Sequence, residues 1–127
     1  MIYGIGTDVL EVRRIEKTYA RFSERFVAHL LMPEERAQLK KTARPVRFLA
    51  MRFAAKEAIV KALGTGFAHG VWIRDVGIWQ NAWGKPEVIY SARGALVRDQ
   101  LGVGEGHVTL SDEAGLVVAM AVLMKKG

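Results

Sequence analysis

The sequence predicts an α+β fold, in which a helical N-terminal half containing one long helix packs on a mainly antiparallel sheet supplied by the C-terminal half. Residues 45–63 are rich in strong helix formers and stand between Pro45 and a glycine-rich stop that begins at Gly64. Residues 75–124 instead contain short apolar runs separated by turn residues. The chain has 127 residues, half of them hydrophobic, and no internal repeat, so we expect a single domain over residues 1–127.

The N-terminal half is expected to begin with a strand and to continue with helices. Residues 1–6 are apolar and punctuated by glycine, which suits a strand leading into a turn, with Asp8 just past it. Apolar residues recur at intervals of three and four over residues 9–31, with basic residues between them. This spacing predicts one bent helix or two short ones with a basic face. Pro33, which two acidic residues follow, predicts the first turn of another short helix before the long one.

The second half is expected to supply the sheet. In order, we expect strands over residues 75–79 and 86–90 joined by a turn, a helix over 91–102, and a hairpin of strands 107–113 and 115–124 that turns near residues 113–115.

Composition and charge narrow the function classes. The chain has no cysteine, which excludes disulfides, cysteine zinc sites and thiol catalysis. It shows no export signal and no run of roughly 20 apolar residues, so we expect a soluble cytoplasmic protein without a membrane partner. Nineteen Lys and Arg against thirteen Asp and Glu give a net charge of +6, which favours an anionic partner. The alternative is that this charge serves only solubility.

Two carboxylates are candidates for chemistry, although each has an ordinary structural explanation. Glu57 and Lys61 lie four residues apart on the predicted long helix and therefore share one face. A surface ion pair worth about 0.2–0.5 kcal/mol would account for them equally well. Asp8, with Glu11 three residues later, resembles a helix capping box and needs no ligand. The residues alone leave both alternatives open.

The segments GIGTDVLEVRRIE, from Gly4, and RFLAMRFAAKEAIVKALGTG, from Arg47, resemble the two sequence motifs of the phosphopantetheinyl transferases, specifically the short holo-acyl-carrier-protein synthase type. The later GKP from Gly84 and HVTLSDE from His107 are similar to further family elements in the expected order, so the resemblance covers nearly the whole chain. It implies the transferase fold and an enzyme of fatty acid biosynthesis. The implied reaction moves the 4′-phosphopantetheine arm of coenzyme A onto a serine of an apo acyl carrier protein and releases adenosine 3′,5′-bisphosphate.

The resemblance assigns Asp8 and Glu57 to a Mg²⁺ ion, which prefers oxygen ligands and is commonly bound by one or two carboxylates plus substrate phosphates. It makes Glu57 and Lys61 the catalytic pair, with Lys61 neutralising phosphate charge. Whether Glu57 or a metal-bound water accepts the serine proton stays open.

The same resemblance implies a set of coenzyme contacts. Lys56 is a weaker candidate, since on a helix it points about 100° away from Glu57. An isolated histidine or a turn lysine beside proline also needs no function. The residues expected at the coenzyme are Arg52, Lys61, Gly64, Gly66, Lys85, Pro86, His107 and Thr109, with the glycines allowing close backbone approach.

The resemblance also implies partners. Acyl carrier proteins are small and acidic, so Arg14, Arg21, Phe22 and Arg25 on the basic helical segment are expected to contact one, although a solvated helix face is the alternative. Related transferases are similar to two such units fused, which implies that this single unit forms a homotrimer with sites at its interfaces.

A non-catalytic basic binding module is the competing function class. No nucleic acid is expected, because the chain has no RNP-like or zinc-finger pattern.

Overall fold

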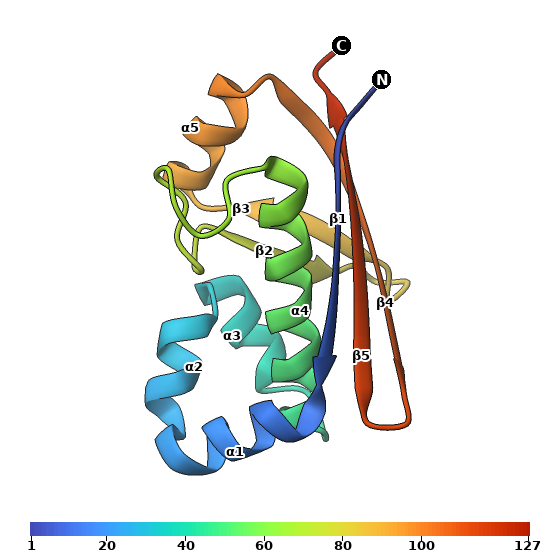
Figure 1. Ribbon diagram of the computed structural model, residues 1–127. Helices are drawn as coiled ribbons and strands as arrows, with labels where there is room; N and C mark the ends of the chain where they lie inside the picture. The colour runs from blue at the N-terminus through green and yellow to red at the C-terminus, as the bar shows by residue number, and fades with distance from the viewer.

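The computed structural model describes residues 1–127 and shows a five-stranded antiparallel sheet, ordered β1-β5-β4-β3-β2, that curls around the long helix α4 (Figure 1). The predicted α+β class is therefore confirmed. The strands are β1 (Ile2–Glu11), β2 (Val76–Gln80), β3 (Pro86–Tyr90), β4 (Val103–Glu113) and β5 (Leu116–Lys125). The helices are α1 (Val12–Phe22), α2 (Glu24–Leu30), α3 (Pro33–Leu39), α4 (Pro45–Leu63) and α5 (Ala92–Gln100).

The first strand is longer than predicted. It continues through Asp8 to Glu11 because β5 offers a paired neighbour along its whole length, with Asp8 opposite Ala119 and Glu11 opposite Leu116. The prediction of a strand that ends at residue 6, with a helix from residue 9, was wrong. Of the two alternatives for the following segment, two short helices are correct, since Ser23 adopts a φ of 46° between α1 and α2.

The long helix was predicted correctly at both ends. Pro45 occupies its first turn, and Gly64, with a φ of 81°, ends it in the left-handed conformation that glycine adopts without strain. Its residues Leu49, Ile59 and Leu63 are at most 2% exposed and belong to one cluster of 23 buried apolar residues. Helix α4 is thus the centre of the core, and whatever its exposed face carries is rigidly held.

Strand β1 approaches α4 unusually closely. A Cβ on Gly4 would lie 2.0 Å from the carbonyl oxygen of Ala62, and a Cβ on Gly6 would lie 2.0 Å from that of Ala58. No side chain fits at either position. The glycines of the first motif and the alanines of the second are therefore the two sides of one packing contact.

The second half follows the predicted order of elements. The β4–β5 hairpin turns at Ala114 and Gly115, which have φ values of 54° and 78°, within the predicted turn. Strand β4 begins at Val103 rather than at residue 107, because Val103 pairs with Lys125 at the end of β5. A bulge between Val103 and Gly106 separates this pair from the rest of the ladder.

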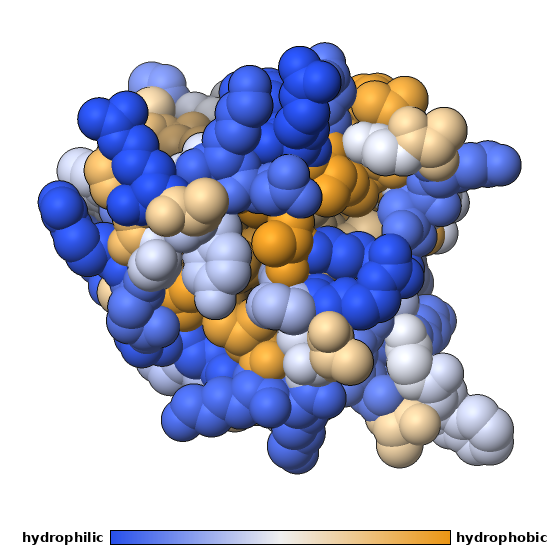
Figure 2. All heavy atoms as spheres, turned by 90° about the horizontal axis from the view of Figure 1, so that it is seen from below, coloured by the Kyte–Doolittle hydropathy of each residue, from blue (hydrophilic) through white to orange (hydrophobic).

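The sheet has an apolar face that the helices do not cover. Ile5, Val9, Val118 and Met120 are between 41% and 62% exposed on β1 and β5. The register places Val9 opposite Val118, so these side chains lie on the side away from α4. At the lower end of the molecule, hydrophilic side chains surround apolar ones near the middle of the surface (Figure 2). None of the helices combines the length and the hydrophobicity that crossing a bilayer requires.

Candidate functional site

Asp8 and Glu57 are brought together by the close contact of β1 and α4. Asp8 is two residues beyond Gly6 and shares a face of β1 with it, because side chains alternate along a strand. Glu57 immediately precedes Ala58, which Gly6 contacts. The Asp8 side chain is only 16% exposed, and Glu57 is half-buried. Residues about fifty positions apart in the chain thus form one carboxylate pair.

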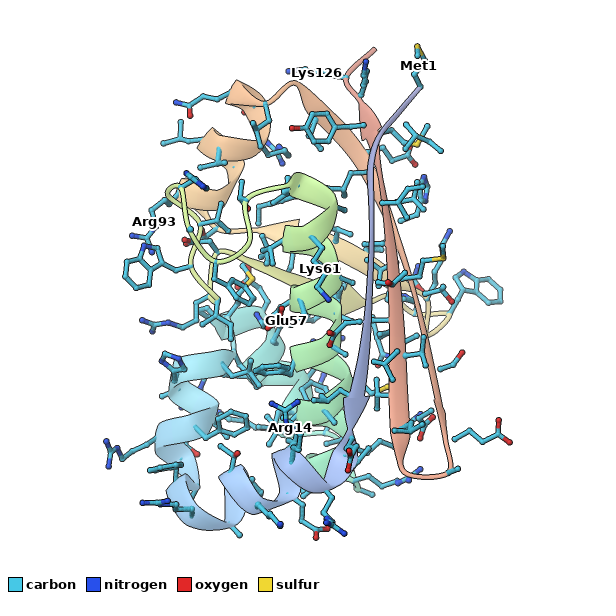
Figure 3. All side chains as sticks on the ribbon, viewed as in Figure 1. Met1, Arg14, Glu57, Lys61, Arg93 and Lys126 are labelled. Carbon is cyan, nitrogen blue, oxygen red and sulfur yellow. The ribbon has the colours of Figure 1, made fainter.

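The alternative explanations for these carboxylates are not borne out. The residue that precedes α1 is Glu11, not Asp8, and its side chain makes no capping hydrogen bond. Lys61 does not pair with Glu57 as a surface ion pair would require. Its Nζ donates instead to the backbone oxygen of Thr7 at 2.9 Å and lies 3.4 Å from Asp8 Oδ1. Figure 3 shows Glu57 and Lys61 one turn apart on α4, with Arg14 below them.

The electrostatics of the pair favour a cation. Partial burial raises the pKa of Glu57, and the neighbouring Asp8 charge raises it further, while Lys61 and Arg14 act in the opposite direction. No third acidic or histidine side chain joins the pair. Two carboxylates with no further protein ligand suit a hard divalent ion such as Mg²⁺, whose remaining positions are filled by water or phosphate oxygens.

The glycines after α4 have a conformational explanation of their own. Gly64 and Gly66 have φ values of 81° and 59°, which disfavour any side chain. A Cβ at either position would meet nothing within 4 Å. The space beside this turn is open, one turn beyond Lys61.

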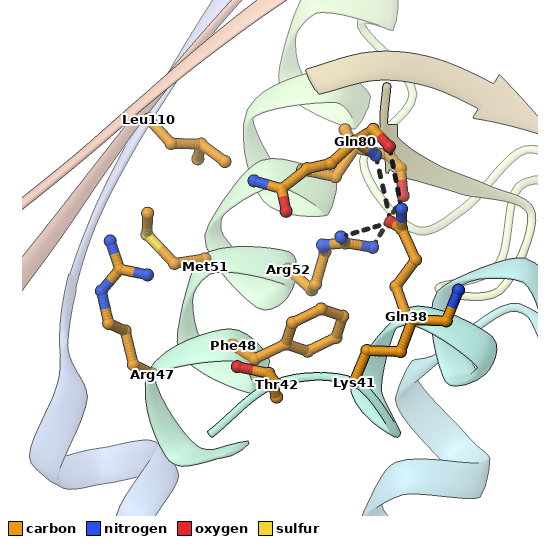
Figure 4. Close-up of a pocket in the computed structure, with 10 residues that line it drawn as sticks. Gln38, Lys41, Thr42, Arg47, Phe48, Met51, Arg52, Gln80 and Leu110 are labelled. Atoms are coloured by element: carbon orange, nitrogen blue, oxygen red, sulfur yellow. Dashed lines mark hydrogen bonds between the residues drawn. The ribbon is translucent and has the colours of Figure 1, made fainter. Parts of the chain in front are cut away.

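Arg52 lies apart from the carboxylate pair, roughly 140° around α4 from Glu57. Its guanidinium is buried, donates to the backbone oxygen of Ile78 at 2.7 Å and to Gln38 Oε1 at 2.9 Å, and stacks on Phe48. Figure 4 shows it at the back of a pocket of about 300 Å³, whose mouth carries Lys41 and Arg47 among other residues.

Lys56 is a core residue. Its Nζ donates to Glu35 Oε1 at 2.6 Å and to the backbone oxygen of Val76 at 2.7 Å, and both charged side chains are fully buried. This buried pairing explains why Lys56 is a weaker candidate for a coenzyme contact. Sequence reasoning missed Glu35, which also accepts from the backbone N–H groups of Met32 and Ile78. Its only sequence signal, an acid in the first turn of a helix, is shared with exposed Glu34.

Lys85, Pro86 and His107 line a separate pocket of about 380 Å³ between β3, α5 and β4, together with Tyr90 and Arg98, which the sequence analysis did not select. Tyr90 is largely buried, and this burial raises its pKa to about 12. Arg98 lies over the Tyr90 ring, 5.0 Å from its centre.

The predicted coenzyme residues divide between the two faces of the sheet. His107 stands opposite Val122, and Thr109 opposite Met120, whose side chains lie on the face away from α4. Asp8 stands opposite buried Ala119 and faces α4. One chain therefore does not bring the two groups of residues together.

The predicted partner-binding residues cluster on α1 and α2. The guanidinium carbons of Arg21 and Arg25 lie 5.1 and 5.8 Å from the centre of the Phe22 ring, and Phe22 is 40% exposed. Phe22 and Arg25 line an open groove with Thr18, Phe26 and His29, which we call the Phe22 groove.

Comparison with known proteins agrees with this geometry. The family model of the 4′-phosphopantetheinyl transferase superfamily matches residues 4–120. The holo-[acyl-carrier-protein] synthase of Neisseria meningitidis serogroup A is 41% identical over 125 residues, covering 98% of this chain and all of the relative. A crystal structure of a holo-[acyl-carrier-protein] synthase from N. meningitidis superposes with a TM-score of 0.93 at 40% identity, covering 98% of this chain and 100% of that one.

A second solved structure carries a ligand. It is a Bacillus anthracis holo-(acyl-carrier-protein) synthase in complex with CoA (3′,5′-ADP), with a TM-score of 0.79 and 35% identity. It covers all of this chain, and this chain covers 99% of it. Together with the paired carboxylates on β1 and α4, these matches confirm the resemblance, and the chain belongs to the 4′-phosphopantetheinyl transferase superfamily.

Proposed function

We propose that this protein is a holo-[acyl-carrier-protein] synthase, which transfers the 4′-phosphopantetheine arm of coenzyme A to a serine of an apo acyl carrier protein and releases adenosine 3′,5′-bisphosphate. The observation that carries the proposal is the Asp8–Glu57 pair, with Lys61 beside it, in a chain similar to synthases over its full length. The B. anthracis relative that binds CoA supports coenzyme A as the donor.

The proposed metal is Mg²⁺, held by Asp8 and Glu57. When bound, it would supply positive charge next to the donor's pyrophosphate. Lys61 and Arg14 both lower the pKa of Glu57 and would neutralise further phosphate charge. Glu57 is also a candidate acceptor for the serine proton, because its carboxylate would lie at the reacting phosphate beside the metal.

The proposed assembly is a homotrimer with its sites between subunits. Asp8, Glu57 and Lys61 belong to the α4 side of the sheet, whereas His107 and Thr109 belong to the other side. A coenzyme that contacts both groups therefore needs the second group from a neighbouring chain. The exposed apolar face of β1 and β5 is a surface that a second copy of this chain would bury.

The acidic carrier protein is proposed to dock on the basic side of α1 and α2. Arg21 and Arg25 flank the exposed Phe22 ring, which gives an apolar anchor between two cations. Arg14 is near enough to Glu57 to lower its pKa, so this surface continues to the carboxylate pair. The cytoplasmic location stays a prediction.

A transfer assay tests the proposal. The protein is mixed with coenzyme A, Mg²⁺ and several apo carrier proteins, and intact-mass spectrometry records addition of the phosphopantetheine arm to the carrier. We expect modified carrier only when Mg²⁺ is present. Mg²⁺-dependent binding of coenzyme A without product on any carrier would contradict the proposed reaction and favour the binding-module alternative.

A further inference from the structure

A second basic groove lies next to the Phe22 groove, and residues of α2 line both. It has a volume of about 570 Å³ and lies between α2, α3 and the residues that precede β2 and begin α5. Four cations line it, Arg36, Lys40, Arg74 and Arg93, against the single carboxylate of Asp75. We call it the α2–α3 groove. Such an excess of one charge in a concave surface concentrates anionic partners.

Two of these cations are available to a partner. Arg36 pairs with Glu24, and Arg93 pairs with Asp75 at 2.9 Å. Lys40 and Arg74 are exposed and form no ion pair within the chain. Their charges are therefore not needed for the fold, and an acidic partner would meet two unpaired cations.

The remaining surface suits a protein. Leu31, Ala28 and Ala37 give the groove an apolar floor. Trp72 is 63% exposed beside it, with the Arg93 guanidinium 5.7 Å from the centre of its ring. Exposed tryptophan and arginine around small apolar residues are enriched where proteins bind proteins. A nucleic-acid backbone would use the cations but not the apolar floor.

The groove adjoins the surface already assigned to the carrier protein. Ala28 lines the α2–α3 groove, and the next residue, His29, lines the Phe22 groove. A globular acidic protein seated on α2 can therefore contact both grooves at once.

We propose that the α2–α3 groove is a second docking surface for the acidic carrier protein, with Lys40 and Arg74 as specificity-determining contacts. The proposal rests on the proposed synthase function. It implies that the carrier contacts both grooves at once, so that charges outside the Phe22 groove also contribute to selection of the carrier.

Steady-state kinetics with the double variant K40E/R74E test this proposal. We expect the KM for the apo carrier to rise roughly tenfold, with kcat and the KM for coenzyme A unchanged, because the lost contacts involve neither the coenzyme nor the reacting atoms. The rise should shrink in 0.5 M NaCl, where exposed charges are screened. If K40E/R74E does not fold, judged by circular dichroism, K40Q/R74Q replaces it, with an expected rise of about threefold.

The matched control is K125E/K126E, at the exposed end of the chain near Met1, where Lys126 is labelled in Figure 3. Each double variant lowers the formal charge from +6 to +2, since two lysine or arginine residues become glutamate. The control should change the carrier KM less than twofold. An equal rise of the carrier KM in the two double variants would show an effect of net charge and would overturn the proposed docking surface.

Two further results would also overturn it. One is an unchanged carrier KM in K40E/R74E beside an active wild-type enzyme, which would leave the synthase function intact. The other is binding of a 20-nucleotide single-stranded DNA that the double variant loses while its carrier KM stays the same, which would assign the groove to nucleic acid. A wild-type protein without any transfer would reject both proposals together.

Discussion

Gly6 contacts Ala58 so closely that a Cβ on Gly6 would lie 2.0 Å from the Ala58 carbonyl oxygen. Asp8 follows Gly6 by two residues on the same face of β1, and Glu57 directly precedes Ala58. The backbone contact thus sets the separation of the two carboxylates. Because the obstructing atom belongs to the helix backbone, no change of side-chain rotamer can make room for a larger residue at position 6.

Substitution of Gly6 should therefore damage stability and the site together. We expect Gly6→Ala to lower the free energy of unfolding by about 1–3 kcal/mol and to move β1 away from α4. Chemical denaturation measures the first effect, and Mg²⁺ titration of the folded variant measures the second as weaker binding. Gly127→Ala is the control, since a Cβ there would meet nothing within 4 Å. A variant with wild-type stability and Mg²⁺ affinity would contradict the assigned role of this contact.

Asp8→Asn separates metal binding from folding. Asparagine preserves the size of the side chain but removes its charge, and the structure shows no helix cap at position 8 to lose. We expect a variant that still folds, a loss of turnover of roughly 100-fold or more at ordinary Mg²⁺, and weaker Mg²⁺ binding by calorimetry. Glu11→Gln, three residues away and exposed, should keep full turnover. Normal activity in the Asp8 variant would remove Asp8 from the metal site.

Most of the fold was predictable because its signals are local. Pro45 and Gly64 mark the ends of α4 because proline fits the first turn of a helix and glycine fits the left-handed residue that ends one. Gly115 marks the hairpin turn in the same way, because glycine tolerates the positive φ that the turn requires. The end of β1 was not predictable in this way. Residues beyond Gly6 become strand because β5, more than a hundred residues later, pairs with them. Such pairing is a property of the tertiary structure, which local patterns do not report.

In the candidate site, too, some residues could be predicted from the sequence and others could not. The motifs identified Asp8, Glu57 and Lys61, and the structure brings all three together. The role of Lys56 was not visible, because its partner Glu35 is 21 residues away and has the sequence context of an ordinary first-turn acid. Burial distinguishes Glu35 from its neighbour Glu34, and burial depends on how α3 packs against β2.

The raised pKa of Glu57 predicts a pH-dependent effect on stability. Burial and the Asp8 charge raise this pKa in the folded state, so the folded protein binds the Glu57 proton more tightly than the unfolded chain does. The stability of the metal-free protein should therefore fall as the pH rises from roughly 4, the ordinary range of glutamate, through the higher folded-state pKa. Glu57→Gln removes this loss, because glutamine does not ionise.

The comparison is made by thermal unfolding of wild type and Glu57→Gln in EDTA. We expect the variant to be more stable than wild type at pH 7, and the difference to vanish near pH 3, where both side chains are neutral. Added Mg²⁺ should then raise the midpoint of the wild type at pH 7 more than that of the variant. A difference that does not change with pH would show that Glu57 has no raised pKa in the folded state.

The last prediction concerns the division of the coenzyme residues between the two faces of the sheet. If one site takes Glu57 from one chain and His107 from its neighbour, two inactive variants should restore each other. In a mixed trimer of Glu57→Gln and His107→Ala chains, some interfaces combine an intact Glu57 with an intact His107. With random assembly about a quarter of the interfaces are of this kind, so we expect roughly a quarter of wild-type activity after co-expression.

Two controls give the background activity. One is each variant expressed alone, and the other is a mixture of the two separately purified variants, which have not exchanged subunits. Light scattering checks that the co-expressed protein is trimeric. Val118→Glu on the uncovered sheet face should break the assembly and abolish the restored activity, because it buries a charge without a partner at the interface. Leu96→Glu, an exposed apolar position on α5, is its matched control and should leave the trimer intact. Co-expressed chains no more active than either variant alone would mean that one chain supplies both groups.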